Sequence, residues 1–296
     1  MGKISVSDDF QQFCKNLRMS DSVVSNVQSR YHSITKRINQ DFWNSDSETR
    51  HSLYVGSYGR GTAIYTSDID IVVELPWDIF SKYDNYSYNG QSALLQAVKN
   101  SLMKTYSSSY INADGQVVDI AFSDGVKFEV VPAFKFSNNC GYYYPDTHDG
   151  GSWKSMNPKS EIDIFNGRNL ITNGNLKRLC RMIRAWNAHN NVFMPGVLID
   201  TLAYKFMQDY EHSDKSYMYY DWMSRDFFQY LTDVSGQDYW LKPGSNQRVY
   251  DKYGFEKEAK EAHIKCIKAL DYCSKGYNYL WNDEWREIYG NKFPTT

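Results

Sequence analysis

The segment from Tyr54 to Leu75, YVGSYGRGTAIYTSDIDIVVEL, constrains the fold more than any other part of the sequence. Its last third, DIDIVVEL, has the apolar and β-branched residues of a buried strand, yet it begins with two aspartates. Side chains two residues apart on a strand point to the same side, so Asp68 and Asp70 share one face, with Cα atoms about 7 Å apart. Carboxylates at that distance repel each other unless a positive charge lies between them. The segment therefore predicts either a strand end exposed to solvent or a binding site for a divalent cation.

The residues around this strand favour the cation site. Glycine tolerates positive φ and lets backbone N–H groups approach a ligand, and a serine adds a hydroxyl donor, so the turn at Gly56-Ser57 is expected to hold phosphate. A third carboxylate, Glu129, lies in the middle of the apolar run VKFEVVPAF, where it either binds a cation or pairs with Lys127 on the same face. Oxygen ligands favour Mg²⁺, which is commonly bound by one or two carboxylates together with substrate phosphates.

Composition narrows the possible partners. The 296 residues carry a net charge of −2 with a pI near 6.3, which argues against the basic surface of a protein that binds long DNA or RNA. The five cysteines are scattered and form no C-x-x-C pair, which predicts free thiols in a reducing compartment. No apolar run approaches the roughly 20 residues that span a bilayer, and none is typical of a secretion signal. We therefore expect a cytoplasmic protein with neither a membrane nor a long nucleic acid as partner.

The first half of the chain alternates helix and strand patterns and predicts a small mixed sheet. A hairpin turn is expected at Ser123-Asp124-Gly125. The expected helices span residues 21–43, with Ser20 as N-cap, and 91–106; the expected strands span residues 51–56, 68–75, 116–122 and 126–134.

The second half has helical spacing almost throughout. The expected helices span residues 173–190, 196–212, 221–234 and 255–277. Residues 138–161, rich in Gly, Asn, Tyr and Pro, are expected to form an irregular crossing between the halves. The sequence therefore predicts two domains, residues 1–165 and residues 166–296, the second mostly helical.

Three motifs together resemble a known superfamily. The stretch GSYGRGTAIYTSDIDIVV resembles the signature of the DNA polymerase β-like nucleotidyltransferases, a glycine-serine turn followed by D-h-D. With the later FEVVPAF and the helix NLKRLCRMIRAWN, it is more narrowly similar to the bacterial CD-NTases, relatives of cyclic GMP-AMP synthase and oligoadenylate synthase. The resemblance implies an α+β fold: a nucleotidyltransferase core of the polymerase β type with a mixed sheet and an N-terminal spine helix in residues 1–165, and a C-terminal helical bundle that binds nucleotide in residues 166–296.

The resemblance also implies a catalytic site with two Mg²⁺ ions, for which Mn²⁺ could substitute. Asp68 and Asp70 would bridge one ion, which binds the triphosphate, and Glu129 would help to hold the second, which activates the acceptor ribose hydroxyl. Pyrophosphate is the leaving group. Glu129 stands where many relatives carry aspartate, so Asp119 on the neighbouring strand remains an alternative third acid.

The residues that would bind nucleotide come from two places in the chain. The turn supplies Gly56, Ser57, Tyr58 and Arg60, although Tyr58 could equally pack and Arg60 could make a surface ion pair. The helix NLKRLCRMIRAWN carries a basic stripe at i, i+4 and i+7, formed by Lys177, Arg181 and Arg184. Lys177 and then Arg181 are the candidates to clamp the triphosphate, and the alternative is a stripe that is simply solvated.

The function implied by this resemblance is the condensation of nucleoside triphosphates, ATP expected among them, into a cyclic di- or trinucleotide. Such a second messenger would reach a downstream effector by diffusion, in antiphage defence. The alternative within the superfamily is a linear oligoadenylate-type synthase or an RNA-tailing enzyme. An enzyme that acts on long RNA needs an extended basic groove, which the pI argues against.

Overall fold

The computed structural model describes residues 5–65, 68–138 and 140–295, and the chain divides into two compact units. We call the unit formed by Met19–Arg60 and Thr66–Ile162 the core unit, and the unit formed by Met1–Arg18, Gly61–Tyr65 and Asp163–Thr296 the helical unit. The division after Ile162 lies three residues before the boundary expected from the sequence. The sequence did not indicate that the first residues and the short excursion Gly61–Tyr65 belong to the helical unit.

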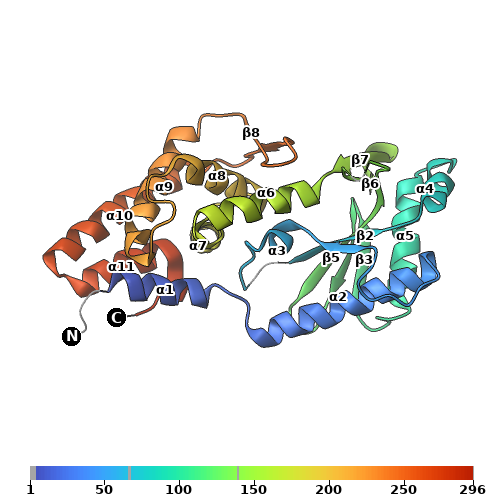
Figure 1. Cartoon of the computed structure of the whole chain (residues 1–296), viewed down its shortest axis with the longest axis horizontal. Coiled ribbons are helices and arrows are strands. Elements are labelled where there is room, and N and C mark those ends of the chain that lie inside the picture. The colour runs from blue at the N-terminus through green and yellow to red at the C-terminus, as the bar shows by residue number, and fades with distance from the viewer. Residues whose placement is uncertain (1–4, 66–67, 139, 296) are drawn as a thin grey trace. The chain divides into compact units, whose positions relative to one another are not determined.

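The core unit is built on a mixed sheet of seven strands (Figure 1). The strands are β1 (Ser52–Tyr54), β2 (Ile69–Glu74), β3 (Tyr110–Asp114), β4 (Val117–Ala121), β5 (Lys127–Lys135), β6 (Tyr142–Asp146) and β7 (Ser152–Met156). Their order is β1-β2-β5-β4-β3, with β6 paired to β5 and β7 to β6. The pair β2–β5 is parallel and the other pairs are antiparallel, which confirms the mixed sheet.

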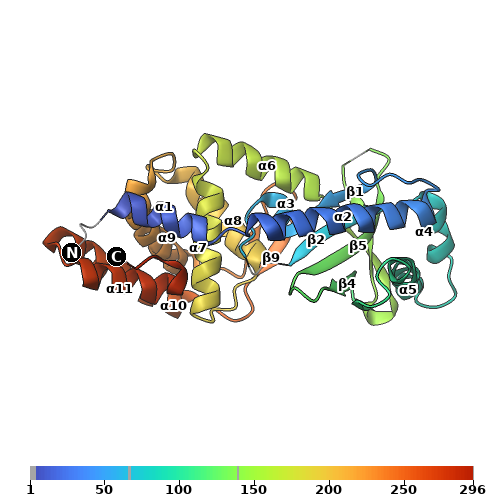
Figure 2. The same cartoon turned by 90° about the horizontal axis from the view of Figure 1, so that it is seen from below.

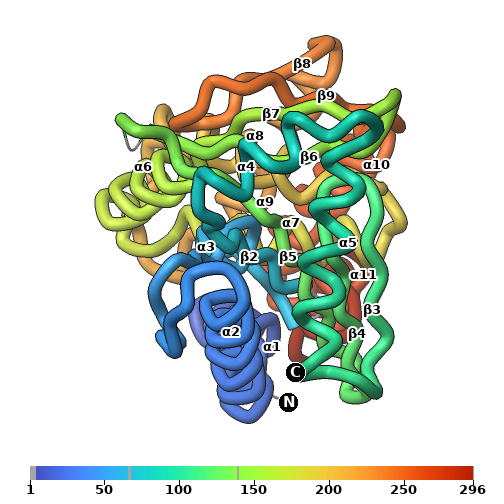
Figure 3. The backbone as a smooth tube through the Cα atoms, turned by 90° about the vertical axis from the view of Figure 1, so that its right-hand side faces the viewer, coloured from blue at the N-terminus to red at the C-terminus, as the bar shows by residue number. Residues whose placement is uncertain are grey.

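Helices α2 (Asp21–Phe42) and α5 (Gly90–Met103) lie side by side and cover one face of this sheet (Figure 3). Ser20 caps α2 as expected, since its side chain accepts a hydrogen bond from the backbone N–H of Val23. Ile69 and Ile71 of β2 are completely buried in the core beneath these helices. The alternation of the strand therefore turns the residues between them, Asp70 included, to the other face. The helix α4 (Trp77–Asp84) follows β2.

The helical unit packs around α10 (Glu256–Lys275), which contacts α9 (Tyr220–Val234) on one side and α11 (Asn278–Tyr289) on the other (Figure 1). Helix α7 (Asn175–His189) packs against α8 (Gly196–Asp209) and α11 (Figure 2). This unit also contains α1 (Val6–Asn16), the hairpin β8 (Tyr239–Leu241) and β9 (Arg248–Tyr250), and the end of α6 (Pro158–Ile171), which begins in the core unit. The expected helical bundle is confirmed.

Two local predictions were wrong. Residues 138–161 are not an irregular crossing, because they contain the hairpin β6–β7 and the start of α6. The strand β6 forms because Tyr142 is buried against Val72 and Ala133 of the sheet, a long-range contact that overrides the local glycine and asparagine signals. The turn at Gly56-Ser57 is a short helix, α3 (Gly56–Arg60). Among the described residues, no helix is both long and apolar enough to cross a membrane.

Candidate active site

A row of carboxylates crosses the sheet on the face opposite α2 and α5. Asp70 of β2 lies beside Glu129 of β5, and Glu129 in turn lies beside Asp119 of β4. Asp68 precedes β2 by one residue and is two residues from Asp70, so the strand alternation places it on the same side. The parallel pairing of β2 with β5 thus brings residues about sixty positions apart in the chain to adjacent places. We call Asp68, Asp70, Glu129 and Asp119 the acid row.

The acid row has too little positive charge for its carboxylates. Burial, followed by the charge of Glu129 and a hydrogen bond shared with it, raises the pKa of Asp70 to about 7, and the opposing effect of Arg60 does not offset this. The pKa of Asp68 is also raised, mainly by burial, and the charge of Lys127 lowers it only in part. A divalent cation would supply the missing charge, and a donor set of carboxylate oxygens suits Mg²⁺ or Mn²⁺. The types of residue in the acid row therefore suit the expected metal ions.

Lys127 occupies part of the acid row. Its Nζ lies 2.8 Å from Oε1 of Glu129 and 3.3 Å from Oδ1 of Asp119, so Glu129 makes the pair with Lys127 that the sequence left open. Within residues 5–65, 68–138 and 140–295, no three His, Cys, Asp or Glu side chains are grouped so that they could hold a metal ion as they stand. The strand register already aligns the acids. Lys127 would therefore compete with a metal ion for Glu129.

Gly56 lies directly against the acid row. It adopts φ +59°, and a Cβ at this position would come within 1.8 Å of Oδ2 of Asp70. The preceding residue, Val55, donates a backbone hydrogen bond of 2.9 Å from its N–H to the carbonyl of Asp70. Only glycine fits here, because of both the left-handed conformation and the close carboxylate. Ser57 follows within α3, so the expected phosphate-binding residues start beside the acids.

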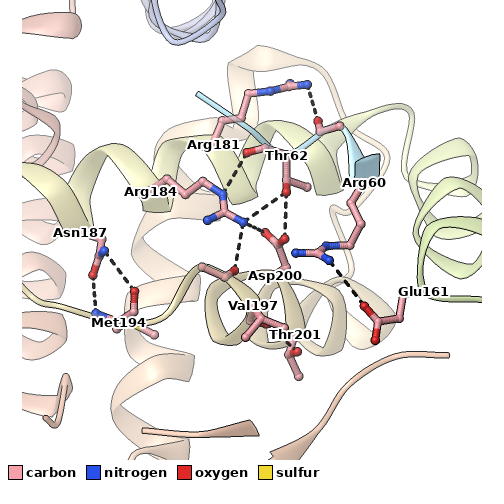
Figure 4. Close-up of polar contacts among 12 residues, drawn as sticks. Arg60, Thr62, Glu161, Arg181, Arg184, Asn187, Met194, Val197, Asp200 and Thr201 are labelled. Carbon is pink, nitrogen blue, oxygen red and sulfur yellow. Dashed lines mark hydrogen bonds and ion pairs between the residues drawn. The ribbon is translucent and has the colours of Figure 1, made fainter. Parts of the chain in front are cut away.

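Tyr58 and Arg60 both make contacts within the core unit. The ring of Tyr58 lies 4.8 Å from that of Tyr54, which stacks on Tyr31 at 4.0 Å. Arg60 is 7% exposed and forms a 3.5 Å ion pair with Glu161 (Figure 4), whose side chain is 12% exposed, so Arg60 does not make the fully exposed surface pair that the sequence left open. Their part in nucleotide binding stays a prediction.

The basic stripe of α7 lies along the excursion Gly61–Tyr65, within the helical unit. Nζ of Lys177 donates a 2.6 Å hydrogen bond to Oδ1 of Asn166, and Arg181 donates one of 2.6 Å to the carbonyl of Gly61. Burial and the charge of Arg181 lower the pKa of Lys177. Lys177 and Arg181 are partly buried, so the stripe is not a simply solvated face. Binding of triphosphate by these two residues stays a prediction.

The third member of the stripe, Arg184, belongs to a buried polar cluster (Figure 4). Its guanidinium forms a 2.7 Å ion pair with Asp200 of α8 and donates to the carbonyl and the hydroxyl of Thr62, at 3.0 and 3.2 Å. Thr62 in turn donates a 2.8 Å hydrogen bond to Asp200. We call Thr62, Arg184 and Asp200 the buried anchor, because they fix the excursion that directly follows α3 in the chain. The one signal of this cluster in the sequence is Asp200, an aspartate inside the apolar run GVLIDTLAYKF.

Replacing Thr62 by valine is expected to lower the free energy of unfolding by about 2–3 kcal/mol, because it leaves a buried ion pair without the hydroxyl. Thr62→Ser keeps the hydroxyl and loses only a methyl group, which costs about 1 kcal/mol. Urea unfolding of the two variants measures the difference. Equal stability of the valine and serine variants would show that the hydroxyl does not support the anchor.

A mixed sheet with an acid row beside a glycine-serine helix is the arrangement that the resemblance to polymerase β-like nucleotidyltransferases implies. The profile of the Second Messenger Oligonucleotide or Dinucleotide Synthetase domain matches residues 4–169, a little more than half of the chain. The chain belongs to this family and is a bacterial CD-NTase. A probable cyclic nucleotide synthase of Bacillus cereus strain VD146 is 25% identical over 254 residues, which cover 80% of this chain and 74% of the relative.

Solved structures share the fold at low sequence identity. CdnC of Escherichia coli MS115-1, solved with ATP, has a TM-score of 0.68 with 14% identity and covers 98% of this chain and 99% of its own. CdnG of Bradyrhizobium diazoefficiens, solved with GTP, has a TM-score of 0.71 with 10% identity, and the match covers 97% and 95% of the two chains. DncV of Vibrio cholerae, a cyclic AMP-GMP synthase, was solved with the linear intermediate pppA(3′,5′)pG. Its TM-score is 0.66 with 13% identity, and the match covers 98% of this chain and 87% of DncV.

Proposed function

We propose that this protein condenses nucleoside triphosphates into a cyclic di- or trinucleotide and releases pyrophosphate in a reaction that depends on Mg²⁺ or Mn²⁺. The observation that carries the proposal is the acid row with Gly56 packed against Asp70. Family membership and the name of the Bacillus cereus relative support a cyclic product. The ligands of the CdnC and CdnG structures support ATP or GTP as substrate.

Each group of residues has one task in this proposal. Asp68, Asp70 and Glu129 hold the two metal ions, which supply charge neutralisation and a more acidic acceptor hydroxyl when bound. Ser57, next to Gly56, donates its hydroxyl to the outer phosphates. Lys177 binds the triphosphate as a positive charge, which the partly buried position strengthens because water screens it less.

We also propose that the product acts as a diffusible second messenger on an effector in antiphage defence. The net charge of −2 supports small substrates over a polymer, because binding of long nucleic acid depends on many phosphate contacts.

Incubation of the purified protein with the four nucleoside triphosphates and Mg²⁺ or Mn²⁺ tests the proposed reaction. Pyrophosphate release together with a product that resists phosphatase is the expected result, and mass spectrometry gives the bases and ring size. Linear products that phosphatase degrades would contradict cyclisation. Absence of pyrophosphate release with either metal would contradict the enzymatic proposal itself.

Lys177→Ala is expected to raise KM for nucleoside triphosphate about ten-fold with a smaller effect on kcat, because a charged contact to phosphate is lost in binding. Lys257→Ala, which removes an exposed lysine of α10 paired only weakly with Glu261, is the matched control and should leave KM unchanged. Steady-state kinetics with each nucleotide measure both values. An unchanged KM for Lys177→Ala would remove this residue from the binding site.

A further inference from the structure

Lys127 is held by two acids of the acid row, and the two contacts are unequal. The 2.8 Å contact of Nζ with Glu129 is also a hydrogen bond. The 3.3 Å contact with Asp119 is longer and weaker: Oδ1 of Asp119 is buried and accepts no hydrogen bond of good geometry in the part of the chain that the structure describes. Asp119 therefore has unused capacity to accept a hydrogen bond from Lys127.

The order of the strands places Asp70 and Asp119 on opposite sides of Glu129, which lies on the same strand as Lys127. Asp70 lies on β2, on one side of Glu129, whereas Asp119 lies on β4, on its other side. Asp70 and Glu129, which with Asp68 would hold a cation, lie on the paired strands β2 and β5. Asp119 then remains beside Lys127, on the side away from β2.

Lys127 competes with a cation for Glu129, and it needs a partner once it loses that contact. The side chains of Lys127, Glu129 and Asp119 are 34%, 30% and 26% exposed, so water shields the ammonium only in part. Removing one partner from such a pair leaves a charge that is poorly compensated. Asp119 can provide the compensation without any backbone movement.

We propose that Asp119 is a positioning residue that retains Lys127 when Glu129 turns to the metal ion, and thereby lowers the competition of Lys127 for the third acid. This inference rests on the proposed metal-dependent function. In this inference the effect of Asp119 on metal binding passes entirely through Lys127. In the alternative, Asp119 is itself a metal ligand and acts without Lys127.

Binding of Mn²⁺ to the full chain without nucleotide, followed by electron paramagnetic resonance, separates these alternatives. The proteins compared are wild type, Asp119→Asn, Lys127→Met, Lys127→Arg and the two double variants that combine Asp119→Asn with each lysine substitution, at about 0.15 M salt to screen distant charges. We expect Asp119→Asn to weaken Mn²⁺ binding about three- to five-fold, as for a partly exposed ion pair, and Lys127→Met to strengthen it. In the Lys127→Met background the Asp119→Asn change should matter less than about 1.5-fold. Lys127→Arg keeps the positive charge. In the Lys127→Arg background, Asp119→Asn should therefore again weaken Mn²⁺ binding.

An equal loss of affinity in both backgrounds would overturn the inference, because Asp119 would then act on the metal directly or through its charge alone. Unchanged or tighter binding by Asp119→Asn in the wild-type background would also overturn it. In either case, loss of Mn²⁺ binding by Asp68→Asn/Asp70→Asn would show that the metal site itself stands. A wild-type protein that binds no Mn²⁺ would instead overturn the proposed metal dependence, and this inference with it.

Discussion

The double substitution Asp68→Asn/Asp70→Asn is expected to abolish product formation, by at least about 1,000-fold, and to leave the protein folded. Both side chains belong to the acid row, and asparagine cannot neutralise a divalent cation as a carboxylate does. The fold should tolerate the change, because burial and the charge of Glu129 already disfavour the ionised form of Asp70. Pyrophosphate release and mass spectrometry measure the product, and circular dichroism measures the fold. Product formation by the double variant would show that the metal assignment is wrong.

The pH dependence of protein stability tests whether the fold disfavours the ionised form of Asp70. The folded state raises the pKa of Asp70 to about 7 from its ordinary value of 3.8, so between these values the folded protein binds the proton more tightly than the unfolded chain. Without metal, wild-type stability from this group is therefore expected to fall as pH rises from about 4 to about 7. Thermal unfolding in EDTA should show that Tm decreases less between pH 5 and pH 8 for the double variant than for wild type.

The substitution Gly56→Ala is expected to reduce activity at least about 100-fold, because it displaces the carboxylate of Asp70 from the position that the acid row requires. The added Cβ would lie 1.8 Å from Oδ2 and 2.6 Å from Cγ of Asp70. The positive φ adds about 1–2 kcal/mol of destabilisation. Steady-state kinetics and urea unfolding measure the two effects separately.

Gly276→Ala is the matched control for this substitution. Gly276 ends α10 with φ +71°, and a Cβ there would meet no atom within 4 Å. It should therefore show a similar loss of stability with unchanged activity. If Gly56→Ala behaved in the same way, the close approach of Gly56 to Asp70 would have no catalytic importance.

Local pattern was sufficient for the elements that bury one regular face. The apolar spacing after Ser20 predicted α2, and the strand alternation predicted that Ile69 and Ile71 share the face opposite Asp70. The hairpin at residues 123–125 joins β4 and β5 as expected. In these elements hydrophobic periodicity and turn chemistry agree with the tertiary fold, so nearby residues contain enough information.

Pattern failed where distant residues decide the structure. The glycines and asparagines of residues 138–161 indicate loop, yet Tyr142 finds an apolar site on the sheet and forms β6. The buried anchor joins residues 62, 184 and 200, and no local pattern links three positions so far apart. Neither outcome follows from propensity, because both depend on what the chain meets after it has folded.

The sequence by itself determined the chemistry of this protein: a glycine-serine pair, two aspartates on one face of a strand and a third acid in an apolar run. Only the tertiary structure decided how these groups meet. The parallel register of β2 and β5 sets Asp70 beside Glu129, and β4 adds Asp119 and gives Lys127 a second partner. The physical reason is that residue type and spacing fix which charges are available, whereas strand pairing fixes the distances that decide whether those charges repel, pair or bind a cation.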